Sequence, residues 1–239
     1  GGPRDLRSSP CTNMVRFRFR RRRPIPDGLW LKCDGCGEIV YKRELESNLK
    51  VCPHCAHHFV MTVEERVETL LDPDSFRPQF EEIRSTDPLG FRARKPYREQ
   101  IEEARAQTGL PEAIVTGTGR IEGYAVAFAC TDSRFLMGSM GSAVGEKFTR
   151  MVEHAGREHL PVVSVSGSGG GARMQESSLS LMQMVKTSSA LRRYSDRGGF
   201  FLSVLTHPTM AGVMASFASL GDVILAEPKA LLGFTGPRV

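Results

Sequence analysis

Residues 161–176 have the sequence PVVSVSGSGGGARMQE, in which a short apolar run passes directly into a glycine-rich turn. The run from Pro161 to Ser166 has the length and the β-branched content of a buried strand. A long helix is expected to follow, from Ala172 to Tyr194. A strand that feeds a helix through a glycine loop is typical of an α/β domain.

The same alternation of elements continues on both sides of this segment. Strands are predicted at residues 113–118, 124–131, 200–206 and 222–226, and helices at residues 142–154 and 212–220. The part of the chain from residue 111 to residue 239 is therefore interpreted as one α/β domain.

Residues 61–110 are expected to form a helical connector to that domain. Thr62 and Glu65 have the spacing of a capping box at the start of a helix. A second helix, at residues 97–108, is expected to stop at Gly109, because glycine readily adopts the left-handed conformation that closes many helices.

The glycine loop at residues 166–172 has two physical uses. Glycines let the backbone approach a ligand closely, and amides in the first turn of a following helix would point at a negative charge. The loop can therefore cradle a phosphate or stabilise an oxyanion on a reacting carbonyl. It lacks the Gly-Lys-Ser/Thr of a nucleotide P-loop and the spacing of a dinucleotide site. A merely flexible connection is the third interpretation.

Two further glycine loops, at residues 138–141 and 233–237, suggest that three loops bind one extended ligand. The sequence has no serine-centred nucleophile elbow, and its histidines have no triad signature. This pattern favours chemistry that uses backbone donors and a base carried by the substrate.

Residues 25–60 contain two Cys-x-x-Cys pairs, which predict a structural zinc ribbon. Two residues between thiolates let a tight turn direct both sulfurs at one metal, and a second pair completes a tetrahedral site. Short strands are expected at residues 38–41 and 49–51. Four sulfurs fill a closed site, so the zinc is expected to be structural. A disulfide is the alternative, but nothing indicates an oxidising compartment. The predicted ligands are Cys33, Cys36, Cys52 and Cys55.

The positive charge of the chain is concentrated at one end. The 239 residues carry a net charge of +5, yet residues 1–24 alone contain eight Arg and one Asp, so the rest of the chain is slightly acidic. A solvated, disordered arm is the expected structure of this segment. Phosphate binding by the arm is the alternative. No membrane span is predicted, because polar residues and His207-Pro208 interrupt the longest uncharged stretch.

Taken together, the ribbon and the loops closely resemble the beta subunit of bacterial and plastid acetyl-CoA carboxylase carboxyltransferase. The resemblance runs from about Pro24 to Val239. It is carried by the Cys-x-x-Cys pairs and by residues 138–142, 170–176, 180–184 and 233–238 in this order.

The resemblance implies a crotonase-like fold and a transfer of the carboxyl group from carboxybiotin, on its carrier protein, to acetyl-CoA. Malonyl-CoA for fatty acid synthesis is the implied product. The implied partners are an alpha subunit, in an alpha2-beta2 heterotetramer, the biotin carboxyl carrier protein, and biotin carboxylase, where ATP is consumed. A bacterial cytosol is the expected location, with the plastid stroma as the alternative. Family members continue beyond Val239, so closing helices are expected to be missing here.

The resemblance also implies roles for individual residues. The oxyanion glycines correspond to Gly170 and Gly171, with Ala172 beside them as a third catalytic position. The expected substrate-binding residues, which would shape the coenzyme A side, are Gly138, Ser139, Gly141, Arg173, Gly233 and Gly236.

Three segments depart from the family pattern. Residues 166–173 carry about two extra small residues, which leaves the register of the oxyanion donors open. Residues 135–138, Phe-Leu-Met-Gly, replace Phe-Met-Gly-Gly, and residues 206–212 have His and Ala where Asp and Gly are usual. These departures predict impaired or altered activity.

Two other functions remain as alternatives. The ribbon and the arm together would suit a nucleic-acid-binding protein whose affinity falls with salt. A self-sufficient crotonase-type enzyme that acts on another acyl-CoA without biotin is the second alternative.

Overall fold

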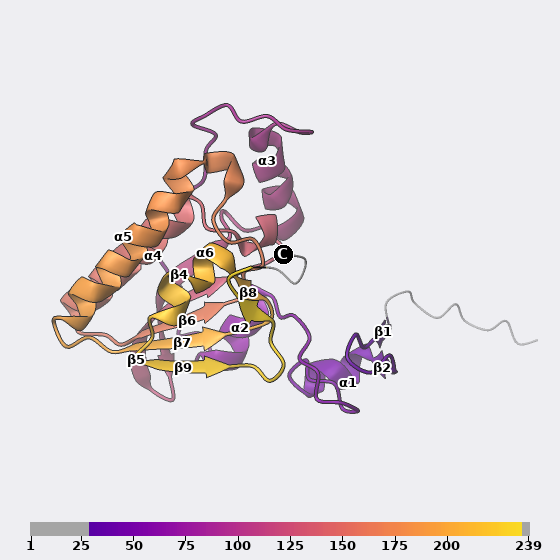
Figure 1. The fold of residues 1–239 in the computed structure, drawn as a ribbon. Helices are drawn as coiled ribbons and strands as arrows, with labels where there is room; N and C mark the ends of the chain where they lie inside the picture. The colour runs from indigo at the N-terminus through magenta and orange to yellow at the C-terminus, as the bar shows by residue number, and fades with distance from the viewer. Residues whose placement is uncertain (1–28, 236–239) are drawn as a thin grey trace, which may run out of the picture.

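The computed structural model describes residues 29–235 (Figure 1). The basic arm expected at residues 1–24 lies outside the described residues, as does Gly236.

A six-stranded sheet forms the centre of the molecule. Its strand order is β3-β4-β5-β6-β7-β9. The pairings from β3 to β5 are antiparallel and those from β5 to β9 are parallel, so β5 belongs to both parts. Parallel neighbours are what the predicted alternation of strands and helices requires. The strands are β3 (Arg77–Pro78), β4 (Ile114–Ile121), β5 (Tyr124–Thr131), β6 (Val162–Ser166), β7 (Phe201–Leu205) and β9 (Val223–Ala226).

Helices cover both faces of this sheet. α4 (Ser142–Glu158) and α5 (Ser178–Ser195) lie side by side on one face (Figure 1). The main core lies between them and the sheet, and there the ring of Phe148 stacks on that of Phe217 at 4.3 Å. α2 (Val63–Leu70) packs against a second apolar cluster on the opposite face. The α/β architecture expected from the sequence is confirmed.

The two helices predicted within residues 61–110 are present. Thr62 and Glu65 form the capping box at the start of α2, with each side chain bonded to the other's backbone amide. α3 (Tyr97–Thr108) ends at Gly109, whose φ is 73°. The buried face of α3 belongs to the main core, so this helix is part of the α/β domain's packing.

The N-terminal part of the described chain forms a small separate unit. β1 (Trp30–Lys32) pairs with β2 (Ile39–Tyr41), and α1 (Lys42–Ser47) follows. Of the two strands expected here, the first is present, whereas residues 49–51 contribute only an isolated bridge from Val51 to His58. Three of its cysteines, Cys33, Cys52 and Cys55, form the core of this unit together with a few apolar side chains.

The helix predicted at residues 212–220 is broken into two short pieces. α6 (Ala211–Met214) is followed by the 3-10 turn η3 (Phe217–Ser219), because Ser216 has a non-helical backbone conformation. β8 (Thr209–Met210) precedes α6 and pairs in parallel with β10 (Leu232–Gly233).

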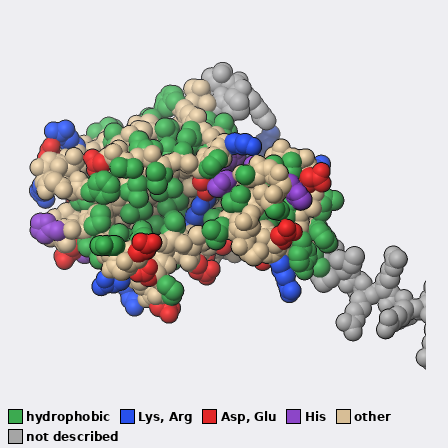
Figure 2. All heavy atoms as spheres, turned by 90° about the horizontal axis from the view of Figure 1, so that it is seen from below, with side chains coloured by type: hydrophobic (Ala, Val, Ile, Leu, Met, Phe, Trp, Pro, Cys, Tyr) green, Lys and Arg blue, Asp and Glu red, His purple; other side chains and the backbone are tan. Residues whose placement is uncertain are grey.

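Apolar side chains gather on the face seen from below the sheet (Figure 2). β9 lies at the edge of the sheet, and Val223, Ile224 and Leu225 on it are each more than 40% exposed. Exposed edge strands with apolar side chains are available for contact with other polypeptides. Within residues 29–235, no helix is long and apolar enough to cross a membrane.

The capping box predicts a measurable contribution to stability. Replacing Thr62 with Ala removes the acceptor for the Glu65 amide and should lower the free energy of unfolding by about 1 kcal/mol. Thr69→Ala is the matched control, because Thr69 in the same helix bonds only to a backbone carbonyl one turn back. Chemical denaturation of the wild type and the two variants measures the free energy of unfolding. Equal losses of stability in Thr62→Ala and Thr69→Ala would contradict the assigned capping box.

Candidate functional site

The glycine loop lies at the carboxyl end of β6, but it does not lead directly into a helix. α5 begins at Ser178, and a 3-10 turn, η2 (Met174–Glu176), stands before it. The expected helix start at Ala172 was therefore wrong. Ser177 has φ 50° and ψ −131°, which no helix accommodates, and this conformation delays the start of α5. The loop amides thus receive no support from the dipole of α5.

The hydrogen bonds of the loop distinguish its amides from one another. The N–H groups of Gly169 and Gly170 both donate to the carbonyl of Met137, at 3.0 and 3.1 Å. In the described part of the chain, the N–H groups of Gly171 and Ala172 have no protein acceptor. These two adjacent backbone donors are therefore unpaired within the described residues and are candidates to bind a negatively charged oxygen.

The shape of the loop requires glycine at two positions. Gly171 has φ 58°, and a Cβ atom on it would lie 2.5 Å from the Cβ of Ala211. A Cβ atom on Gly170 would lie 2.7 Å from the Cβ of Ser139. Both distances are far below van der Waals contact, so a larger residue at either position would displace a neighbouring loop.

The predicted substrate-binding residues of the second loop lie directly against the first. Gly138 has φ 69°, and a Cβ atom on it would lie 2.9 Å from the carbonyl oxygen of Gly167. The Ser139 hydroxyl donates to the carbonyl of Leu136. A Cβ atom on Gly141 would lie 2.5 Å from a carboxylate oxygen of Glu176. The structure therefore brings residues 138–141 and the glycine loop together.

The third loop reaches the same neighbourhood through strand pairing. Gly233 on β10 is the partner of Met210 on β8, which immediately precedes Ala211. Gly236 lies outside the described residues. Gly233 therefore lies beside residues 209–211, and the arrangement of three loops around one ligand stays a prediction.

Arg173 is fully buried, with only 1% of its side chain exposed. Its Nη2 atom donates to Glu112 at 2.8 Å and to the carbonyl of Ser139 at 2.9 Å. Its Nη1 atom donates to the hydroxyls of Ser85 and Tyr97, at 2.7 and 2.9 Å. Since the guanidinium is surrounded by protein acceptors, we assign Arg173 a positioning role in place of direct substrate contact.

Glu176 connects this buried cation to α4. Its Oε1 atom lies 3.4 Å from Arg173 and accepts a hydrogen bond from the Tyr97 hydroxyl at 2.6 Å. Its Oε2 atom accepts from the backbone N–H of Ser142 at 2.6 Å, in the first turn of α4. The carboxylate therefore satisfies an orphan donor of the helix and is favoured by the helix dipole.

Charge pairing sets the protonation of the buried carboxyl groups. Burial acts to raise the pKa of Glu112, but the adjacent Arg173 guanidinium outweighs it and holds the pKa below its ordinary value. Glu112 is thus an anion that compensates the buried cation. Sequence reasoning missed Glu112, Tyr97 and the capping role of Glu176, because none of them lies in a recognisable spacing with Arg173.

The four predicted zinc ligands converge in the ribbon. Their sulfur atoms all lie within 4.8 Å of one another, with Cys33 and Cys55 3.7 Å apart and Cys36 and Cys52 3.9 Å apart. A tetrahedral zinc with bonds of about 2.3 Å separates its sulfurs by about 3.8 Å, so the donor set fits this metal. A Cβ atom on Gly35 would lie 2.8 Å from the Cβ of His57 and 3.1 Å from the Cys55 sulfur, which explains the glycine in the first knuckle.

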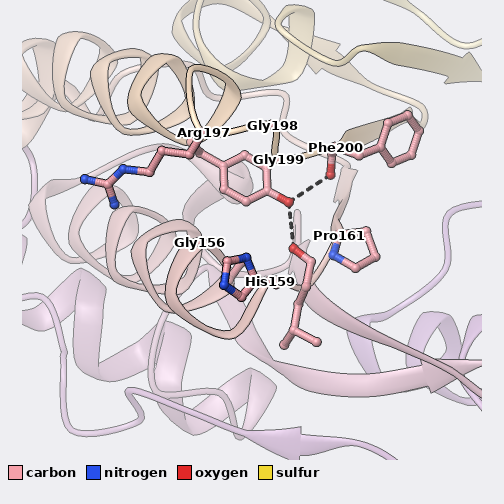
Figure 3. Close-up of a pocket in the computed structure, with 10 residues that line it drawn as sticks. Gly156, His159, Pro161, Arg197, Gly198, Gly199 and Phe200 are labelled. Carbon is pink, nitrogen blue, oxygen red and sulfur yellow. Dashed lines mark hydrogen bonds between the residues drawn. The ribbon is translucent and has the colours of Figure 1, made fainter.

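One cavity lies far from these loops, at the amino-terminal ends of the central strands β6 and β7 (Figure 3). It is lined by residues that end α4 and precede β6 and β7, among them His159, Arg197 and Phe200. The hydroxyl of Tyr194 donates to the carbonyls of Leu160 and Phe200 there, and Arg197 extends away from it (Figure 3). The cavity lies at the amino-terminal ends of β6 and β7, away from the glycine loop at the carboxyl end of β6, so the chemistry is not expected here.

Comparisons with known proteins agree with this description. Residues 60–239 match the family model "Carboxyl transferase domain", and residues 30–55 match "Acetyl-CoA carboxylase zinc finger domain". The chain is 55% identical over 218 residues to the acetyl-coenzyme A carboxylase carboxyl transferase subunit beta of Rhodopirellula baltica, covering 91% of this chain and 70% of that protein. It is 53% identical over 220 residues to the same subunit of Synechococcus sp. strain JA-3-3Ab, covering 92% of this chain and 70% of that protein.

Solved structures show a similar fold. The transcarboxylase 12S core, solved with methylmalonyl-coenzyme A and methylmalonic acid, superposes with a TM-score of 0.62 at 28% identity, over 74% of this chain and 31% of that larger one. A Pseudomonas malonate decarboxylase heterodimer has a TM-score of 0.55 at 22% identity, over 74% of this chain and 67% of that one, which shows the fold alone.

The buried ion pair predicts a pH-dependent stability. Glu112→Gln leaves the Arg173 cation without its main counter-charge and should lower the free energy of unfolding at neutral pH by about 3 kcal/mol or more. Since folding lowers the pKa of Glu112, the folded chain binds this proton more weakly than the unfolded chain. The difference between wild type and variant should be full above the ordinary pKa of 4.5 and should shrink as the pH falls through the lower folded value.

Urea denaturation between neutral and acidic pH measures this difference. Glu103→Gln is the matched control, because Glu103 pairs with Lys95 on the surface and should contribute less than about 1 kcal/mol. A pH-independent difference for Glu112→Gln would refute the assigned ion pair.

The metal site predicts a selective loss of zinc. Cys33→Ser removes one of four thiolates and should abolish stoichiometric zinc, because the site needs all four sulfurs. Cys130→Ser, in β5 and remote from the ligand set, should keep one zinc per chain. Metal analysis of the purified proteins decides this, and full zinc in the Cys33 variant would exclude the site.

Proposed function

We propose a role for the glycine loop that starts from the family of the chain, which belongs to the carboxyl transferase beta subunits of acetyl-CoA carboxylase, and these make malonyl-CoA. In this proposal, the amides of Gly171 and Ala172 hold the thioester oxygen of acetyl-CoA during carboxyl transfer. The observation that carries the proposal is the pair of adjacent N–H groups without a protein acceptor, in a loop whose shape excludes side chains.

Carboxyl transfer needs backbone N–H donors while the enolate of acetyl-CoA is present. Removal of a proton from the acetyl methyl group moves negative charge onto the thioester oxygen, and two positioned N–H groups stabilise that charge. For this to happen, the carbon–nitrogen bond of carboxybiotin breaks first, which releases the carboxyl group as CO2 and leaves a basic nitrogen. The methyl carbon of the enolate then forms the new carbon–carbon bond with this CO2. The biotin nitrogen accepts the proton that the methyl group loses, so no side-chain base of this chain is required.

The loop geometry divides the three expected catalytic positions into two roles. The Gly170 amide already donates to Met137, so Gly170 is proposed to shape the loop, whereas Gly171 and Ala172 are proposed to bind the oxyanion. Gly138, Ser139, Gly141 and Gly233 are proposed to form the coenzyme A side, since they lie beside the same loop.

Arg173 is proposed to hold the donors in place. It follows Ala172 directly, and its side chain is bonded to Glu112 and to the carbonyl of Ser139 in the neighbouring loop. Its own backbone N–H donates to the carbonyl of Met140 at 2.9 Å. Because Arg173 is held by both its backbone and its side chain, it restricts the directions in which the preceding N–H groups of Gly171 and Ala172 point.

As a beta subunit of acetyl-CoA carboxylase, the chain works in a complex with the other subunits of that enzyme. We propose an alpha2-beta2 assembly with the alpha subunit, which receives carboxybiotin from the carrier protein after biotin carboxylase has loaded it, in a bacterial cytosol. Exposed apolar side chains on α5, among them Leu181, Met182 and Val185, and on β9 support extensive contact with other polypeptides.

The proposed donors predict a severe kinetic defect at one glycine. Gly171→Ala should lower the rate of malonyl-CoA formation by roughly 10²–10³, because the added Cβ meets Ala211 and moves the donor amides. The assay uses the chain reconstituted with its alpha subunit and carboxybiotin. Zinc content and thermal melts show whether the variant remains folded.

Gly198→Ala is the matched control for this variant. Gly198 has φ 79°, and nothing lies within 4 Å of the position of its Cβ atom, so alanine imposes backbone strain without steric overlap at a remote turn. This variant should keep most of its turnover. Equal rates for Gly171→Ala and Gly198→Ala would mean that the oxyanion site lies elsewhere.

A further inference from the structure

We propose that Asp132 and Glu227 are positioning residues through which α2 holds in place the two segments that flank the glycine loop. The inference rests on the proposed function, since it concerns the direction of the donor amides in that loop. It assigns a task to two acidic side chains outside the network described around Arg173.

The order of the strands places one segment on each side of the glycine loop. β5, β6 and β7 are parallel neighbours, so their carboxyl ends lie at the same edge of the sheet. The glycine loop follows β6, whereas residues 132–138 follow β5 and residues 206–211 follow β7. These two ranges are the flanking segments.

Each flanking segment is hydrogen-bonded to the glycine loop. On one side, the carbonyl of Met137 accepts from the N–H groups of Gly169 and Gly170. On the other side, the N–H group of Met210 donates to the carbonyl of Ser168 at 2.9 Å. A shift of either segment would therefore move the backbone that presents the two donors.

Asp132 connects the first flanking segment to α2. Its side chain is only 2% exposed, and its Oδ2 atom accepts from the backbone N–H of Val63, the first residue of α2, at 3.0 Å. Its Oδ1 atom accepts from the backbone N–H of Arg134, within the segment, at 2.9 Å. The guanidinium of Arg134 in turn donates to Asp132 and to Glu64 in the first turn of α2. The beginning of the helix is thus bonded to this segment.

Glu227 connects the second flanking segment to the same helix. It directly follows β9, and its side chain is 12% exposed. Its Oε1 atom accepts from the Nη2 atom of Arg66 in α2, and its Oε2 atom accepts from the backbone N–H of His207 at 3.4 Å. The carboxylate therefore lies between α2 and the segment that contains Met210.

α2 makes both connections at the edge of the sheet where the glycine loop lies. Val63 and Arg66 are three positions apart in one helix, so they lie on the same face. A small cavity behind the loop is lined by Arg66 together with Thr131, Gly167 and His207. Since a helix is a rigid element, its two connections fix the spacing between the flanking segments.

Amide variants of the two residues test these connections without removing the side chains. Each carboxylate uses both oxygens as acceptors, one toward α2 and the other toward a flanking segment. An amide has nearly the same shape but only one acceptor oxygen. Asp132→Asn and Glu227→Gln should therefore each lose one connection and keep the packing.

The test measures malonyl-CoA formation by the chain reconstituted with its alpha subunit and carboxybiotin. Each single variant should lower kcat at least about tenfold, because misplaced donors stabilise the transition state less. The KM for acetyl-CoA should change less than about twofold, since the contacts to coenzyme A remain. An unchanged kcat in either variant, or a loss confined to KM, would overturn the assigned role.

The double variant tests whether the two residues act through one helix. Since both hold the same loop through α2, the kcat of Asp132→Asn/Glu227→Gln should fall clearly less than the product of the two single losses. Losses that multiply would mean two independent effects and would overturn the shared role of α2.

Glu153→Gln is the matched control for the loss of a carboxylate. Glu153 in α4 pairs with Arg193 in α5 at 3.3 Å, and both side chains are about half exposed. Its kcat should equal that of the wild type. A loss as large as that of Asp132→Asn or Glu227→Gln would attribute the effect to charge alone and overturn the proposal.

The failure of this inference can be distinguished from the failure of the proposed function. Full turnover in Gly171→Ala would contradict the oxyanion role of the loop. Amide hydrogen exchange would still test the positioning role, because the bonded amides of Gly169 and Gly170 should exchange at least about tenfold faster in Asp132→Asn and Glu227→Gln. Exchange at the wild-type rate in both variants would overturn the proposal.

Discussion

The arrangement of the site depends on one buried cation. Arg173 is removed from water, and such a charge is tolerated only when anions and hydrogen-bond acceptors surround it. Two of its partners come from distant parts of the chain, since Glu112 precedes β4 and Tyr97 begins α3, while Glu176, three residues further on, caps α4. These segments must all be in place before the charge is compensated. The glycine loop, which has no helix directly behind it, is therefore positioned through a side chain at its end.

The same construction explains why the loops are rich in small residues. Peptide groups from residues 138–141 and 167–172 pack against one another, and at Gly138, Gly170 and Gly171 a Cβ atom would overlap a neighbour. In this packing the amides of Gly169 and Gly170 donate to the carbonyl of Met137, whereas those of Gly171 and Ala172 have no acceptor within the described residues. In the proposed function, the charge that develops on a thioester would be met by these main-chain N–H groups, which do not titrate in the physiological pH range. Activity at this step should follow loop geometry more than the ionisation of any side chain.

Local features of this structure could be predicted from the sequence, and non-local ones could not. The cysteine spacing predicted the zinc ligands, and Thr62 and Gly109 marked helix ends, because each depends on neighbours a few residues away. The strand alternation likewise predicted the α/β sheet. The start of α5 was missed, since a helical pattern continues through Ser177 although its backbone turns away. Which amides are free depends on the carbonyl of Met137, more than thirty residues earlier. No spacing rule reports such a contact.

The central claim is that the Gly171 and Ala172 amides bind the thioester oxygen, and a crystal structure of the complex with a non-reactive acetyl-CoA analogue tests it most directly. The account predicts that the analogue's carbonyl oxygen lies within about 3 Å of both nitrogens, with Arg173 still paired to Glu112. An analogue whose carbonyl points away from this loop, or onto a side chain, would contradict the account.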